Sequence, residues 1–164
     1  MITKGLAGLD GTRHTLCIIG AGPVGLSLAL ELERTGHRVL LLESGDMGPT
    51  PEAQALSDAE IVDTALHVPM DIGVQRSLGG TSNLWGGRCV PFGPIDFQTR
   101  PAVPHSGWPI SMAEVAPFLP AACGYIGCGQ AVFEQDLPDF KPGDPDFIFD
   151  KVERWSRRPR FTDM

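Results

Sequence analysis

The alternation of hydrophobic and polar residues is most regular near the start of the chain. Thr15 to Ile19 is a short apolar run with β-branched residues, and Arg38 to Glu43 is a second apolar run. Such runs are typical of strands that are buried on both faces. Between them, Val24 to Thr35 places its apolar residues on one side of a helix, and Gly36 is a typical residue to end it. This order predicts one parallel β-α-β unit with a right-handed crossover.

The rest of the chain has a less regular pattern. The mostly polar segment Pro51 to Ala65 is expected to form one helix. Prolines are dense from Pro91 to Pro120 and prevent long regular elements there. We therefore expect an extended excursion with one helix over Ser111 to Leu119, where Ser111 and Glu114 have the spacing of a capping box.

A glycine-rich turn joins the first predicted strand to the helix. It reads Gly20-Ala21-Gly22-Pro23-Val24-Gly25, a complete G-x-G-x-x-G in the strand-to-helix context that a dinucleotide site requires. The first glycine makes the turn, the second lets a pyrophosphate approach the backbone, and the third lets the helix pack on the strand. The helix N-terminus then offers N–H groups and partial positive charge to the phosphates. The residues expected to bind the cofactor here are Gly20, Gly22, Pro23, Val24 and Gly25.

An acidic residue at the end of the second predicted strand extends this motif. Glu43 lies about twenty residues beyond the glycines, where a carboxylate can accept hydrogen bonds from a ribose. Glu43 and the following Ser44 are expected to bind the cofactor. Glu43 would repel a 2′-phosphate, and no arginine follows directly, so NADP is disfavoured. The β-α-β unit alone leaves both FAD and NAD open.

Composition narrows the classes of partner and compartment. The net charge of −7 argues against a nucleic acid. The apolar stretch from Leu16 to Leu30 is interrupted by glycines and is too short to span a bilayer. The four cysteines have no paired C-x-x-C spacing, so we expect neither a zinc site nor a disulfide framework. Without disulfides, a reducing compartment is the default, and we expect a cytoplasmic location. Cys17, in an apolar run, is expected to be a small buried hydrophobe.

A second glycine-rich stretch, RSLGGTSNLWGGR, runs from Arg76 to Arg88. Two glycine pairs in so short a loop carry a conformational cost, which indicates that something approaches the backbone closely. The stretch resembles the signature loop of the glucose–methanol–choline (GMC) oxidoreductases, which are FAD-dependent enzymes that oxidise alcohols and sugars. The segment His105 to Ile110 is similar to one seen in bacterial members of that superfamily. The positions that match the signature are Arg76, Leu78, Gly79, Gly80, Thr81 and Ser82.

The resemblance implies FAD as the cofactor, with this loop beside the flavin and its pyrophosphate. Trp85 stands where the family usually has Asn or His, and an indole cannot accept a hydrogen bond. Leu84 stands where relatives with covalent flavin have a histidine, so we expect non-covalent FAD. The loop residues expected to bind the cofactor are Arg76, Gly79, Gly80, Thr81, Ser82, Trp85 and Gly86.

The resemblance also implies a catalytic histidine late in the family's chain, and no residue of this sequence matches it. We therefore expect no catalytic residue and no metal ligand here. The expected fold is α/β, an incomplete Rossmann-like FAD-binding fold with a parallel sheet (core 14–90) and an irregular proline-rich extension (91–164). We interpret the sequence as the N-terminal part of an FAD-binding domain, inactive alone, from an enzyme for a small alcohol or sugar with an electron acceptor left open.

Two alternatives remain beside this interpretation. One is another class of FAD-dependent oxidoreductase, and the other is a non-catalytic dinucleotide-binding module. His67 and His105 are treated as loop residues that could line a site. Trp108 is expected to anchor the proline-rich excursion onto its domain.

Overall fold

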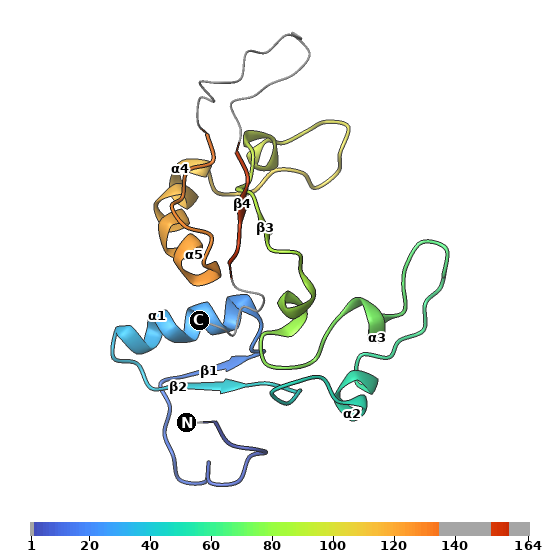
Figure 1. Cartoon of the computed structure of the whole chain (residues 1–164), viewed down its shortest axis with the longest axis vertical. Coiled ribbons are helices and arrows are strands. Elements are labelled where there is room, and N and C mark those ends of the chain that lie inside the picture. Colours follow the sequence, from blue (N-terminus) through green and yellow to red (C-terminus); the bar gives the residue numbers. More distant parts are fainter. Residues whose placement is uncertain (1, 135–151, 158–164) are drawn as a thin grey trace. The chain divides into compact units, whose positions relative to one another are not determined.

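The computed structural model describes residues 2–134 and 152–157, and these residues form two compact units (Figure 1). The first unit contains the described residues up to Trp85, and the second contains those from Gly86 onward. In the described parts of the chain, no helix combines the length and the hydropathy needed to cross a membrane.

The first unit is built on a β-α-β element. Strand β1 (Leu16–Ile19) pairs in parallel with β2 (Val39–Leu42), and the two strands are in register along their whole length. Helix α1 (Pro23–Arg34) connects them and packs on both strands (Figure 1). A proline at the first helical position suits α1, because the N–H that proline lacks has no partner there in any helix. The predicted parallel β-α-β arrangement is confirmed.

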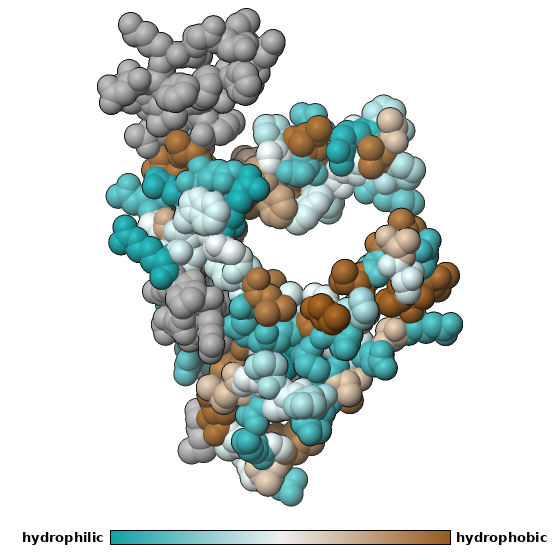
Figure 2. Space-filling model, turned by 45° about the vertical axis from the view of Figure 1, so that its right-hand side comes forward, coloured by the Kyte–Doolittle hydropathy of each residue, from teal (hydrophilic) through white to brown (hydrophobic). Residues whose placement is uncertain are grey.

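The strands of this element are more exposed than the sequence predicts. Ile19 is 85% exposed, Cys17 is exposed, and β2 is half-buried throughout. Figure 2 shows that hydrophobic residues also lie on the surface of the described chain. In the part of the chain that the structure describes, this sheet has only two strands and lacks the further strands and helices that bury larger parallel sheets. The predictions of strands buried on both faces and of a buried Cys17 are therefore wrong.

The segment after β2 contains two short helices, α2 (Pro51–Ala55) and α3 (Met70–Gly73). Helix α2 begins as expected at Pro51, where the hydroxyl of Thr50 accepts a hydrogen bond from the N–H of Ala53 at 3.2 Å. The prediction of one helix from Pro51 to Ala65 is wrong, because α2 ends after about one turn. Helices gain most of their stability by packing apolar side chains, and α2 buries only Ala53.

The second unit combines a short antiparallel pair with a helical segment. Its elements are β3 (Arg88–Cys89), the 3₁₀ turn η2 (Pro94–Phe97), α4 (Met112–Val115), the 3₁₀ turn η3 (Ala116–Phe118), α5 (Leu119–Ile126) and β4 (Arg154–Trp155), with β3 paired to β4.

The helical segment of this unit begins where the sequence predicts and ends later. Glu114 accepts a hydrogen bond from the N–H of Ser111 at 2.8 Å, which is half of the expected capping box. The predicted end at Leu119 is wrong, because the segment continues through α5 to Ile126. Pro120 lies in the first turn of α5, a position that tolerates proline, so it starts a helix there instead of ending one.

Three of the four cysteines lie in the interior of the second unit. Cys89, Cys123 and Cys128 are all buried, and their electrostatic interactions link the three thiols. Burial, followed by the interactions with Cys128, raises the pKa of Cys123 to about 11. The N–H of Cys128 bonds to the carbonyl of Cys123 at 3.1 Å around Gly127 in the left-handed conformation, which closes the end of α5.

An aromatic cluster holds part of the proline-rich excursion together. The ring of Trp108 lies 4.9 Å from that of Phe92 and 6.1 Å from that of Phe97, measured between centroids. Both ring partners lie within the excursion itself, so the anchoring of the excursion onto its domain by Trp108 stays a prediction. His105, in the same excursion, is exposed and has a positive φ of 58°.

Candidate nucleotide-binding site

The turn between β1 and α1 has the geometry that its glycines predict. Gly20 has φ of 100°, which favours glycine. A Cβ on Gly25 would lie 1.9 Å from the carbonyl oxygen of Gly20, so only a glycine lets α1 pack so closely. A Cβ on Gly22 would meet no atom within 4 Å. The second glycine therefore faces open space, where a ligand can approach the backbone.

The N-terminus of α1 is suited to an anion. Its N-cap residue is Gly22, which has no side chain to bond the first N–H groups, and no acidic residue lies in the first turn. The N–H groups of Val24 and Gly25 lie in the first turn, where backbone N–H groups have no acceptor within the helix. These groups and the helix dipole can serve a phosphate, as the sequence predicts.

The second glycine loop lies directly against the first. The N–H of Gly79 donates a hydrogen bond of 2.8 Å to the carbonyl of Ala21, which is fully buried. A Cβ on Gly80 would lie 3.4 Å from the Cα of Gly22. Both Gly79 and Gly80 have positive φ, of 88° and 59°. Two segments that were predicted separately to serve one ligand are thus neighbours in space.

Glu43 lies immediately after β2 and reaches back to the glycine turn. Its Oε2 accepts a hydrogen bond from the N–H of Ala21 at 2.8 Å. Its Oε1 accepts from the N–H of Gly45 at 2.9 Å and from the hydroxyl of Ser44 at 3.2 Å. Partial burial by itself raises the pKa of Glu43, but these hydrogen bonds outweigh it and hold the pKa below its usual value. The carboxylate is therefore ionised at neutral pH, and Oε2 retains a lone pair for a ribose hydroxyl.

Gly45 joins the end of β2 to the second loop, a role that the sequence analysis missed. A Cβ there would lie 2.3 Å from the carbonyl oxygen of Arg76 and 2.7 Å from the Cα of Ser77. The N–H of Leu78 also donates to the carbonyl of Asp46 at 2.9 Å. The sequence marks this contact only by a glycine two residues after Glu43. Such a glycine indicates a close backbone contact only when the segment packed against it is known.

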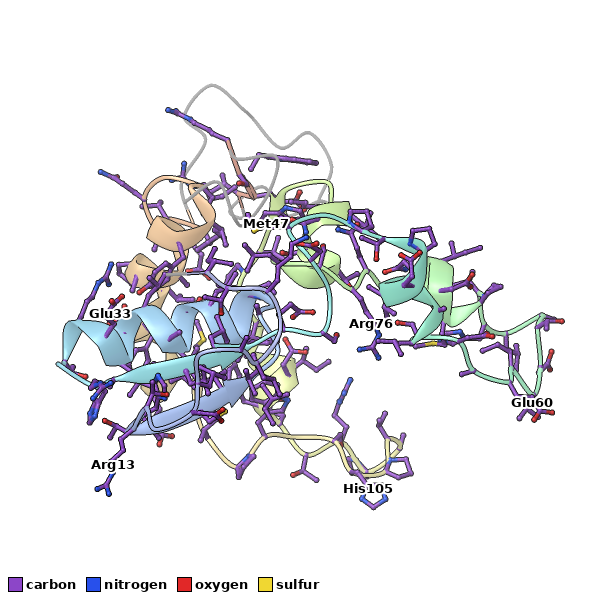
Figure 3. The ribbon with its side chains drawn as sticks, turned by 90° about the horizontal axis from the view of Figure 1, so that it is seen from below. Arg13, Glu33, Met47, Glu60, Arg76 and His105 are labelled. Atoms are coloured by element: carbon purple, nitrogen blue, oxygen red, sulfur yellow. The ribbon has the colours of Figure 1, made fainter. Side chains whose placement is uncertain are left out.

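Arg76 is held by side chains from α2 and from the residues that follow β2. Its Nε donates to the hydroxyl of Ser57 at 2.6 Å, and its Nη1 donates to the hydroxyl of Ser44 at 2.9 Å. Its backbone N–H donates to Oε1 of Gln54 at 2.6 Å. Ser57 and Gln54 were not singled out from the sequence, because no local pattern marks a polar residue that bonds a distant loop. Figure 3 shows Arg76 beside the segment that carries α2.

The remaining residues of the loop shape its 3₁₀ turn, η1 (Gly80–Leu84). Thr81 accepts a hydrogen bond from the N–H of Gln75 at 3.1 Å, and Ser82 donates to the carbonyl of Gly79 at 2.6 Å. Thr81 and Ser82 thus support the loop through their hydroxyls.

Two buried polar atoms of this loop have no partner among the described residues. They are Oδ1 of Asn83 and Nε1 of Trp85. The Nδ2 of Asn83 is satisfied by the carbonyl of Leu78 at 2.9 Å, so one end of this amide is bonded and the other is not. Buried polar groups are normally paired, so such atoms are expected beside a bound group or a further segment.

The structure brings some of the residues predicted to bind a cofactor into contact: the Gly79–Gly80 turn lies against the first glycine turn, which also bonds Glu43. The predicted residues from Gly20 to Trp85 lie in the first unit, whereas Gly86 is the first residue of the second. In the described parts of the chain, no cluster of three or more His, Cys, Asp or Glu side chains is placed to hold a metal ion. The open space at Gly22, the helix N-terminus and the ionised Glu43 fit a dinucleotide.

Comparison with known proteins agrees with this geometry. The model of the DAO family, described as FAD dependent oxidoreductase, matches residues 15–56, which span β1, α1, β2 and α2. A dihydrolipoyl dehydrogenase of Bacillus subtilis (strain 168) is 32% identical over 78 residues, which are 43% of this chain and 17% of that protein. A 6'''-hydroxyparomomycin C oxidase of Streptomyces lividus is 29% identical over 126 residues, which are 70% of this chain and 23% of that protein. The chain thus spans about a fifth of the length of these relatives.

The fold and the site define the class of this unit as a Rossmann-like FAD-binding fold. The predicted cofactor is confirmed: it is FAD, and non-covalent binding is the usual mode in the matching family. The matches also support an FAD-dependent oxidoreductase as the kind of protein to which this unit contributes.

Proposed function

We propose that this chain supplies the FAD-binding part of a GMC-type oxidoreductase that oxidises the CH–OH group of a small alcohol or sugar. The observation that carries the proposal is the hydrogen bond from Gly79 to Ala21, which joins the two glycine loops. The GMC signature begins in the second of these loops, from Arg76 to Ser82. A signature loop seated on the nucleotide-binding turn is the arrangement that the resemblance implies.

The proposed type of substrate has support from one relative. The Streptomyces lividus protein is by its name an oxidase of a hydroxylated compound, 6'''-hydroxyparomomycin C. Its similarity to this chain extends over 126 residues, well beyond the residues matched by the family model. An alcohol group as the electron donor is consistent with both the signature loop and this relative.

Within the proposed function, each part of the site has a separate task. The N–H groups at the start of α1 bind the pyrophosphate, and the open backbone at Gly22 lets it approach. Glu43 accepts hydrogen bonds from the ribose. The Gly79–Gly80 turn, with no side chains of its own, lies close to the cofactor. The FAD held by these groups would supply the hydride acceptor for oxidation of the CH–OH carbon. We assign no base to this chain and expect it to bind FAD without oxidising an alcohol.

Flavin binding and substrate reduction test different parts of this proposal. The purified chain is mixed with FAD, and retention of the flavin absorbance after gel filtration measures binding. Release of the flavin on denaturation and precipitation is expected for a non-covalent cofactor. Failure to bind FAD, with the chain folded by circular dichroism, would contradict the proposed function.

The GMC assignment is tested with the bound flavin under anaerobic conditions. A longer protein that includes this sequence is expected to lose its flavin absorbance when an alcohol or sugar is added, whereas this chain alone is expected to keep it. Reduction by NADH and not by any alcohol would favour the second candidate, a flavin-dependent dehydrogenase of another class. The similarity to a dihydrolipoyl dehydrogenase over 78 residues is the observation that favours this candidate.

A further inference from the structure

Arg76 is a half-buried cation whose side-chain hydrogen bonds to the described residues are all to neutral groups. Its guanidinium donates to the hydroxyls of Ser57 and Ser44 at 2.6 and 2.9 Å. The ion pairs found among the described residues join Lys4 to Asp46 and two other arginines to glutamates, and Arg76 is in none of them. A guanidinium has five N–H groups, and the serines use two of them. The others remain able to donate to a ligand.

The position of this guanidinium identifies which part of a dinucleotide it can meet. The hydroxyl of Ser44 accepts from Arg76 and donates to Oε1 of Glu43 at 3.2 Å. Arg76 is therefore one hydroxyl away from the carboxylate that serves the adenosine ribose in this kind of fold. Gly79 and Gly80 lie instead against Ala21 and Gly22, at the phosphate turn. One loop thus contacts two different parts of the nucleotide site.

Gln54 in α2 holds the backbone of Arg76, and Ser57 just after α2 fixes the direction of its side chain. Ser57, just after α2, is only 8% exposed, and its hydroxyl receives the Nε–H. Gln54 accepts from the backbone N–H of Arg76 and donates to the carbonyls of Asp71 and Val74 at 2.7 and 3.0 Å. These bonds hold both the backbone and the guanidinium plane, so the arginine is oriented before a ligand arrives. Such orientation reduces the entropy lost on binding.

We propose that Arg76 binds the adenosine half of the nucleotide, at the ribose and its 5′-phosphate, and that Gln54 and Ser57 are the residues that position it. This inference rests on FAD binding by the unit and departs from the resemblance, which places the whole loop beside the flavin and pyrophosphate. A planar guanidinium suits this role because it donates several hydrogen bonds in one plane to phosphate and hydroxyl oxygens. The partner of Glu43 at the ribose is therefore an arginine that is distant in sequence.

ADP and FAD are the probes that test this inference. Arg76→Ala is expected to weaken both ligands by about the same factor, roughly tenfold, the size of one lost charge-assisted hydrogen bond. Equilibrium dialysis with each ligand measures the two dissociation constants. Arg76→Lys keeps the positive charge but lacks the planar guanidinium and its several N–H donors. It is expected to recover part of the affinity. Arg13→Ala is the control, because Arg13 is exposed and lies well away from Arg76 (Figure 3).

The positioning role is tested with Ser57→Ala and the double variant. Ser57→Ala is expected to weaken ADP several-fold, and the double variant with Arg76→Ala is expected to be no weaker than Arg76→Ala alone. If the losses of ADP binding free energy in the two single variants add fully in the double variant, Ser57 does not act through Arg76. That result would overturn the positioning role.

Three results would overturn the adenosine assignment, and they are distinguishable. Unchanged ADP affinity with weakened FAD would place Arg76 at the flavin half. Unchanged affinity for both ligands would remove Arg76 from the site. Failure of the unaltered chain to bind either ligand would contradict the proposed function as well, and the inference would fall with it.

Discussion

The backbone N–H of Gly79 donates a 2.8 Å hydrogen bond to the carbonyl oxygen of Ala21. Ala21 is the second residue of the G-x-G-x-x-G turn, and its own N–H donates to Glu43 at 2.8 Å. One buried alanine therefore connects the second glycine loop, the glycine turn and the acidic residue after β2. The geometry of each of these three parts depends on the other two.

Alanine substitutions at Gly25 and Gly22 are expected to have different effects. The Gly25 variant should mainly lose stability, and the Gly22 variant should mainly lose affinity for FAD. Gly25→Ala places a Cβ 1.9 Å from the carbonyl oxygen of Gly20. It should lower the free energy of unfolding by about 2–3 kcal/mol, as overpacking does. Gly22→Ala has room and an ordinary φ of −75°, so it should cost less than about 1 kcal/mol and still weaken FAD by filling the open space. Urea unfolding and FAD titration of both variants measure the two effects, and equal stability of the variants would contradict the packing argument.

Replacement of Gly45 is expected to disturb the joint between β2 and the second loop. Gly45→Ala brings a Cβ within 2.3 Å of the carbonyl oxygen of Arg76, and both neighbouring segments are backbone with little freedom to move. We expect a loss of about 1–3 kcal/mol in unfolding free energy and weaker FAD binding. Gly48→Ala is the matched control in the same loop, since its Cβ would meet no atom within 4 Å. Similar stability of the two variants would show that the loop joint does not depend on Gly45.

The hydrogen bonds of Glu43 predict a specific dependence on pH. The pKa of Glu43 is lowered in the folded chain, so its contribution to stability is present above the pKa of the unfolded chain and is lost as pH falls through the folded pKa. Glu43→Gln removes this contribution. The difference in unfolding free energy between the parent chain and the variant should therefore be largest near neutral pH and should shrink below about pH 4. Urea unfolding at several pH values measures it, and a difference that does not change with pH would argue against the ionised carboxylate.

The four cysteines are expected to divide into one reactive and three protected thiols. Cys17 is exposed, whereas Cys89, Cys123 and Cys128 are buried, and burial raises the pKa of Cys89 and Cys123. The thiolate is the reactive form, so these two groups should react slowly at pH 8. Titration with a disulfide reagent should give one fast equivalent in the native chain and the remainder only after unfolding. Cys17→Ser should abolish the fast phase, and its persistence would show that the interior of the second unit opens readily.

Local pattern in the sequence was sufficient for the β-α-β element and its glycine turn. The apolar runs, Pro23 at the start of the helix and the spacing of Gly20, Gly22 and Gly25 act within a few residues of one another. The resulting backbone geometry depends little on the rest of the chain. The same is true of Ser111, which begins its helix as predicted.

Only the tertiary structure decided what lies beside these local elements. The exposure of Ile19, the early end of α2 and the bonds of Arg76 to Ser57 and Ser44 depend on partners that are distant in the sequence. A hydrophobic run shows that a strand is able to be buried, but burial requires a neighbouring layer, which no local pattern supplies. For the same reason, the sequence indicated that Gly79 and Gly80 approach something, and the fold identified the glycine turn as their neighbour.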